Sequence, residues 1–234
     1  MSAGDVWRFA FSLSVAFPAI VSIICFKKVN EGYRPFLIYT IVSLINELLV
    51  GFVIVPNNKK GMNLDNNIFY LFEALILFAQ FYLWKRPRPN KLYWGILAGV
   101  LTAGWIFENF VAKSIIKYNI VFAVSYSFLL VLLSVQTINY IIINEGRVSL
   151  TKNAKFIICT ATIILFIYNM FVFITMNATA KNINGTVLYD KVLVSNIFAI
   201  KVYVNAFCNL LYGIAVCLIP QKKSTGELFK NFDF

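Results

Sequence analysis

Several ionisable and amide side chains stand inside long apolar segments of this chain, where they could bind a small polar ligand or carry a proton. The residues concerned are Glu47, Glu73, Glu108, Asn169, Lys201, Asn205 and Asn209. A charge at bilayer depth costs at least about 2.5–3.5 kcal/mol, so such groups face the protein interior and mark functional sites by default. We therefore interpret these residues as candidate ligand-binding residues.

The spacing of three candidates predicts a shared helix face. Lys201, Asn205 and Asn209 recur at every fourth position, which places them on one side of a helix. An ion pair from Lys201 to Glu73 or Glu47 would offset part of the cost of burying these charges. Three plainer interpretations stay open: Lys201 extends to the membrane surface, the two asparagines join neighbouring helices, and Glu108 reaches the headgroups.

Long apolar segments must position these residues. Each segment is close to the roughly 20 residues that a helix needs to cross the hydrocarbon core. Backbone polar groups in lipid must be paired within the segment, which favours helices. We expect residues 1–234 to form one all-α transmembrane domain, a seven-transmembrane-helix bundle. The predicted helices are about 9–26, 36–55, 68–84, 93–111, 119–143, 156–176 and 197–219.

The distribution of Lys and Arg predicts the orientation of the bundle. Alternate connecting segments hold 13 of the 21 basic residues, namely 27–35, 85–92, 144–155 and 220–234. Cytoplasmic loops carry this excess, so the N-terminus is expected outside and the C-terminus in the cytoplasm. The net charge of +11 then reflects topology and contact with membrane lipids, and nucleic acid is not an expected partner.

The composition argues against several kinds of chemistry. The chain has no histidine, so the commonest metal ligand and the usual near-neutral acid or base are both missing. Its four cysteines fall in the apolar segments and match no metal-binding spacing. We expect no metal and no cofactor. Whether the protein is an enzyme stays open, with a non-enzymatic role favoured.

Two similar stretches predict an internal repeat. Asn-Glu-Gly occurs at 30–32 and again at 144–146, and the apolar segments that follow carry Asn46 and Asn169. The pattern indicates two parallel three-helix units joined by the fourth helix, a 3+1+3 pseudo-repeat. This layout is similar to that of PQ-loop and SWEET-type transporters. Their hallmark Pro-Gln pairs are missing here, since Pro220-Gln221 ends the seventh segment instead.

Three polar stretches carry a second resemblance. They are Asn46-Glu47-Leu48-Leu49, Tyr70-Leu71-Phe72-Glu73, and Asn205 to Asn209 followed by Leu210-Leu211-Tyr212. On these stretches the chain resembles small seven-helix inner-membrane proteins of Bacteroidetes. The resemblance implies a multi-pass protein of the bacterial inner (cytoplasmic) membrane and implies no activity. A composition rich in Ile, Asn, Lys and Phe is typical of an AT-rich bacterial genome.

These observations favour a sensory or accessory membrane protein that binds a small amphipathic or polar ligand in an outward-facing pocket. The predicted helices occupy most of the chain, so we expect it to act through a partner, either a signalling kinase or a larger membrane complex. One alternative is a small proton-linked 3+1+3 transporter that uses Glu47 or Glu73. A second is a membrane-embedded lipid-modifying enzyme with these carboxyl groups as acid and base.

Overall fold

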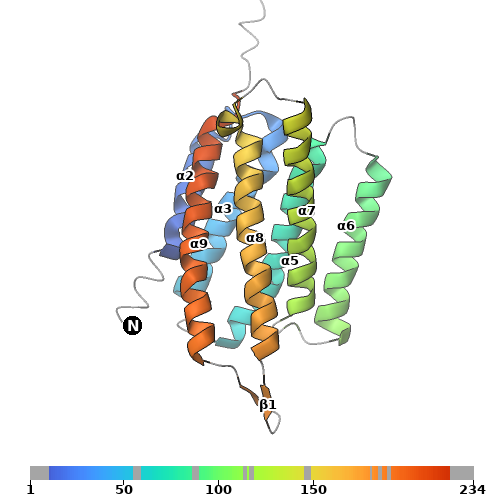
Figure 1. The fold of residues 1–234 in the computed structure, drawn as a ribbon, viewed down its shortest axis with the longest axis vertical. Coiled ribbons are helices and arrows are strands. Elements are labelled where there is room, and N and C mark those ends of the chain that lie inside the picture. Colours follow the sequence, from blue (N-terminus) through green and yellow to red (C-terminus); the bar gives the residue numbers. More distant parts are fainter. Residues whose placement is uncertain are drawn as a thin grey trace, which may run out of the picture.

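Long helices lying side by side make up most of the chain (Figure 1). The computed structural model describes residues 11–54, 59–85, 90–112, 115, 119–144, 149–179, 181–183, 186–188 and 191–221. The helices are α2 (Ala16–Cys25), α3 (Arg34–Leu49), α5 (Lys59–Trp84), α6 (Lys91–Ile106), α7 (Ile120–Asn144), α8 (Ala154–Thr179) and α9 (Lys191–Leu218).

Shorter elements flank these helices. The 3₁₀ turns are η1 (Leu13–Val15), η2 (Glu31–Tyr33) and η5 (Leu150–Lys152). The π-helical turns η3 (Val50–Ile54) and η4 (Phe107–Ala112) continue α3 and α6. Between α8 and α9, strand β1 (Lys181–Ile183) pairs antiparallel with β2 (Thr186–Leu188).

Among the described residues, six helical segments are long and apolar enough to cross a membrane, which confirms the multi-pass prediction. They are Glu31–Phe52, Asn63–Trp84, Lys91–Ala112, Ile120–Asn144, Ala154–Ala178 and Asn196–Leu218. The first predicted span corresponds to a shorter apolar helix, Leu13–Cys25. Positions 9, 10 and 55 of the predicted spans lie outside the described residues.

The largest boundary difference is at α5, which begins at Lys59 rather than near Ile68. Residues 59–67 are mainly polar, so a prediction from apolar length alone begins the helix too late in the chain. Intrahelical hydrogen bonds can extend a helix beyond the hydrocarbon core, where its side chains meet headgroups and water.

The helices form a closed ring with one helix outside it. Neighbours around the ring are α2, α3, α5, α7, α8 and α9, and α9 packs back against α2. In the described part of the chain, α6 packs mainly against α5 and α7 and continues into η4. It lies at the edge of the bundle (Figure 1). A 3+1+3 repeat requires this order, but order alone does not establish superposition of the two units, so the repeat stays a prediction.

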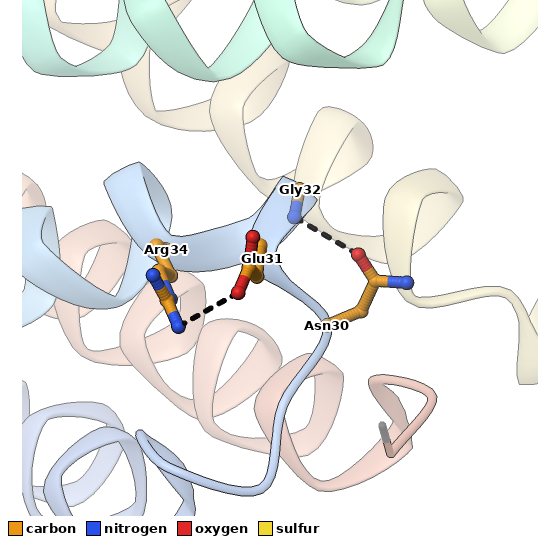
Figure 2. A network of polar contacts seen from close by, with 4 residues as sticks. All are labelled: Asn30, Glu31, Gly32 and Arg34. Carbon is orange, nitrogen blue, oxygen red and sulfur yellow. Dashed lines mark hydrogen bonds and ion pairs between the residues drawn. The ribbon is translucent and has the colours of Figure 1, made fainter. Parts of the chain in front are cut away.

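A tight turn leads from α2 into α3 (Figure 2). The side-chain oxygen of Asn30 accepts a hydrogen bond from the backbone N–H of Gly32 at 2.9 Å. Arg34 forms an ion pair with Glu31 at 3.1 Å on the surface of the same turn. Asparagine at this position satisfies a donor that the beginning of a helix leaves unpaired.

Gln80 on α5 holds the beginning of α3 from the bundle interior. Its Oε1 accepts from the backbone N–H of Phe36 at 2.8 Å, and its Nε2 donates to the carbonyl of Gly32 at 2.6 Å. The side chain is 1% exposed. These two bonds set the position of α3 relative to α5, and therefore of the site residues further along both helices.

Helices α2 and α9 pack closely at a glycine. The ring of Phe17 occupies the space that a Cβ atom on Gly213 would need. Any larger residue at position 213 would require the ring of Phe17 to move, and small residues at helix contacts are common in membrane proteins.

Candidate functional site

A cavity of about 190 Å³ lies between α3, α5, α8 and α9, in the half of the bundle nearest β1 and β2. Its lining comes from residues 39–47 of α3, 66–73 of α5, 165–169 of α8 and 201–209 of α9, with Ser12 and Val15 before α2. The structure therefore brings together most of the residues singled out from the sequence, and their role in ligand binding stays a prediction. Those at the cavity are Glu47, Glu73, Asn169, Lys201, Asn205 and Asn209.

Glu73 is the most deeply buried carboxyl group of this cavity, with 6% of the residue exposed. The Tyr39 hydroxyl of α3 donates to its Oε1 at 3.1 Å, and the Tyr126 hydroxyl of α7 donates to its Oε2 at 2.6 Å. Each carboxyl oxygen thus has one phenolic donor. These bonds orient the carboxyl group and offset part of the cost of burying it.

Tyr39 and Tyr126, the two partners of Glu73, were not among the site residues predicted from the sequence. Tyrosine is common in transmembrane helices, and its apolar ring hides the hydroxyl in a hydropathy pattern. Their position in the middle of an apolar segment could have identified them, because a tyrosine hydroxyl buried there needs a hydrogen-bond partner.

The ion pair expected for Lys201 is not present in the described part of the chain. No carboxyl oxygen of Glu47 or Glu73 lies within 4.0 Å of its ammonium nitrogen, although both interact with it electrostatically over a longer distance. The Lys201 Nζ lies 5.7 Å from the ring centre of Phe173 and 6.0 Å from that of Phe198. Cation–π contacts and the phenolic donors to Glu73 take the place of the expected ion pair.

Two amide oxygens at the cavity are buried without a hydrogen-bond partner. They are Oδ1 of Asn169 on α8 and Oδ1 of Asn205 on α9. Leaving a buried acceptor unpaired costs about 1–3 kcal/mol. The other amide of the α9 face, that of Asn209, has a partner, because its Nδ2 donates to Ser14 Oγ at 2.9 Å. A molecule that donates hydrogen bonds to Asn169 and Asn205 would remove this cost.

Glu108 lies away from this cavity, at the beginning of α7. Its Oε1 accepts from the backbone N–H of Val121 at 3.1 Å, and its Oε2 accepts from that of Phe122 at 2.5 Å. The residue is 5% exposed, so it does not extend into the headgroups. A carboxylate at a helix N-terminus satisfies free N–H groups and complements the helix dipole, which makes Glu108 a capping residue.

The side chains described at this cavity offer carboxyl oxygens, amide oxygens and the amine of Lys201. Glu47 and Glu73 supply carboxyl oxygens, Asn169 and Asn205 supply amide oxygens, and Lys201 supplies the ammonium. Among the residues that the structure describes, no group of three or more His, Cys, Asp or Glu side chains is placed to hold a metal ion. The arrangement suits a ligand with several donors, or a proton.

No family model, curated protein or solved structure matches this chain. Its class follows from its own fold and composition. Six apolar helices of membrane-spanning length make it a multi-pass helical membrane protein.

Proposed function

We propose that this protein binds a small cationic or hydroxyl-bearing ligand in the cavity at Glu73 and acts as a sensory or accessory protein of the bacterial inner membrane. The observation that carries the proposal is the pair of buried, unpartnered oxygens on Asn169 and Asn205, beside two carboxyl groups. Carboxyl and amide oxygens of Glu47, Glu73, Asn169 and Asn205 lie on the cavity wall, and a ligand that carries hydrogen-bond donors complements them.

The size of the cavity supports a molecule rather than a single water. Its volume of about 190 Å³ is more than ten times the roughly 10–15 Å³ that one water needs. The apolar side chains of Leu165 and Phe69 also line it, which suits a ligand that is partly apolar. Amphipathic amines and small polyols have this combination of properties.

The proposed orientation places the cavity in the outer half of the membrane. The basic segments 85–92 and 144–155 adjoin the end of the bundle opposite β1 and β2. If that end is cytoplasmic, as the excess of Lys and Arg favours, the cavity can exchange its ligand with the outside. Binding would then shift the helices of the ring, and a partner kinase or membrane complex would detect the shift.

The proposal is tested by purifying the protein from its native host and identifying the small molecules that co-purify with it. Wild-type protein should carry an amine- or hydroxyl-bearing compound detected by mass spectrometry, and Glu73→Gln should lose most of it. Glu31→Gln is the matched control, because Glu31 pairs with Arg34 on the exposed turn before α3, away from the cavity. Equal amounts of compound in all three proteins would contradict the proposal.

A proton-linked transporter is the second candidate, favoured by one specific observation. Asn46 and Asn169 stand in helices that the predicted repeat makes equivalent, and both line the same cavity. Transporters built from repeats bind substrate at the interface between the two units. Uptake of the identified compound into proteoliposomes, with a pH-sensitive dye inside, would support transport. Co-purification of a kinase without uptake would support the sensory role.

A further inference from the structure

A second cavity, of about 150 Å³, lies at the opposite end of the bundle between α5, α6 and α7. The end of α5, the beginning of α6 and the second half of α7 form its wall. It shares no lining residue with the cavity at Glu73. Its polar side chains include those of Trp84, Lys85, Gln136 and Tyr140.

The polar lining of this second cavity is dominated by donors. Trp84 is 7% exposed, and its Nε1 is buried without a hydrogen-bond partner. An indole N–H can only donate, so the group that satisfies it must be an acceptor. The exposed Lys85 places its ammonium 5.5 Å from the ring centre of Trp94, and both residues line the cavity. None of the lining residues in the described part of the chain is acidic.

The cavity lies at the level where a membrane changes from hydrocarbon to headgroups. Trp84 ends one candidate span, and Lys91 begins the next. The sequence 85–91 contains four basic residues and no acidic one, so the local charge is positive. Basic pockets between transmembrane helices at this level bind the phosphate groups of anionic lipids.

We propose that this cavity binds the phosphate of an anionic glycerophospholipid. Trp84 Nε1–H donates to a phosphate oxygen, and the Lys85 ammonium pairs with the phosphate charge. Phe81 and Leu133 on the same wall contact the glycerol and the first part of the acyl chains. A free phosphate ion offers the same oxygens to Trp84 and Lys85 but makes no use of this apolar wall.

The test uses the full chain in detergent, titrated with phosphatidylglycerol or phosphatidylcholine and followed by native mass spectrometry. Phosphatidylglycerol should bind more tightly, and Trp84→Phe and Lys85→Gln should each weaken it about tenfold, equivalent to about 1.4 kcal/mol. Lys152→Gln removes an exposed charge at the same end of the bundle, outside this cavity, and should bind normally. Trp105→Phe is the matched indole control, because Trp105 donates to the carbonyl of Asn67 instead.

Three results would decide the matter. Equal binding of the two lipids, or equal losses in Lys85→Gln and Lys152→Gln, would overturn the proposal. Displacement of phosphatidylglycerol by millimolar inorganic phosphate would support the phosphate chemistry and overturn the lipid as its source. Weaker binding in Trp84→Phe, with Trp105→Phe unaffected, would support the indole N–H of Trp84 as the donor.

Discussion

The hydroxyl of Tyr126 lies 2.6 Å from Oε2 of Glu73 and joins α7 to α5 across the interior of the ring. Tyr39 reaches the other carboxyl oxygen from α3, so three helices meet at one acidic side chain. The carboxyl group therefore has a structural role as well as a place on the cavity wall. Variants of Glu73 and Tyr126 can separate the structural role from the role in ligand binding.

Glu73→Gln should reduce ligand binding at least about tenfold while lowering stability by only about 1–2 kcal/mol. The amide keeps one carbonyl oxygen for a phenolic donor, but it loses the charge and the second acceptor. Thermal unfolding in detergent and ligand binding should be measured on the same preparation. A variant that binds normally and only unfolds earlier would assign Glu73 a purely structural role.

Tyr126→Phe should destabilise the protein by about 1.5–3 kcal/mol, since it removes a hydrogen bond to a group that can carry charge. The loss should be smaller when Glu73 is already glutamine, because the two side chains contact each other directly. Unfolding of both single variants and the double variant in mixed detergent gives the coupling energy. Additive losses would mean that the 2.6 Å contact contributes little.

Glu108→Gln should destabilise the protein by about 1–2 kcal/mol and leave ligand binding unchanged. Glutamine retains one of the two acceptors that meet the N–H groups of Val121 and Phe122, and it loses the charge at the beginning of α7. Thermal unfolding and ligand titration check both halves of the prediction. A large loss of ligand affinity at unchanged stability would show that Glu108 acts on the ligand after all.

Gly213→Ala should destabilise the protein by about 1–3 kcal/mol, because the new methyl group meets the ring of Phe17. Gly99→Ala is the matched control, since nothing lies within 4 Å of a Cβ atom built there. On helix propensity alone, Gly99→Ala should be neutral or stabilising by up to about 1 kcal/mol. Unfolding of the two variants should therefore differ in sign, and equal shifts would mean that α2 and α9 separate easily.

Membrane topology can be checked with tags at the two ends of the chain. A tag before Met1 should react with a membrane-impermeant reagent in intact cells, and a tag after Phe234 should react only after lysis. This outcome would place the Glu73 cavity in the outer half of the membrane and the Lys85 cavity on the cytoplasmic side. The reverse labelling pattern would exchange the two sides and remove the outside as the source of the ligand.

Much of the architecture could be predicted from the amino-acid sequence. A membrane-spanning helix needs an apolar run about as long as the bilayer is thick. The six spans found among the described residues can therefore be recognised from the sequence without knowing how the helices pack. The burial cost of Glu47, Glu73 and Lys201 also depends mainly on residue type and depth, so their presence at one cavity follows from the sequence. The shortness of the first apolar helix was not predicted, because the difference lies at its beginning, where the apolar run continues toward the N-terminus but a 3₁₀ turn, Leu13–Val15, precedes α2.

Only the tertiary structure decided which groups are paired. Glu73 accepts from Tyr39 and Tyr126 rather than binding Lys201, and Glu108 caps α7 rather than facing the cavity or the headgroups. Hydrogen bonds need donor and acceptor within about 3 Å and well aligned, and this depends on the rotation and offset of each helix in the ring. The rotation and offset of each helix are set by side-chain packing between helices. A hydropathy pattern along one chain carries no information about this packing.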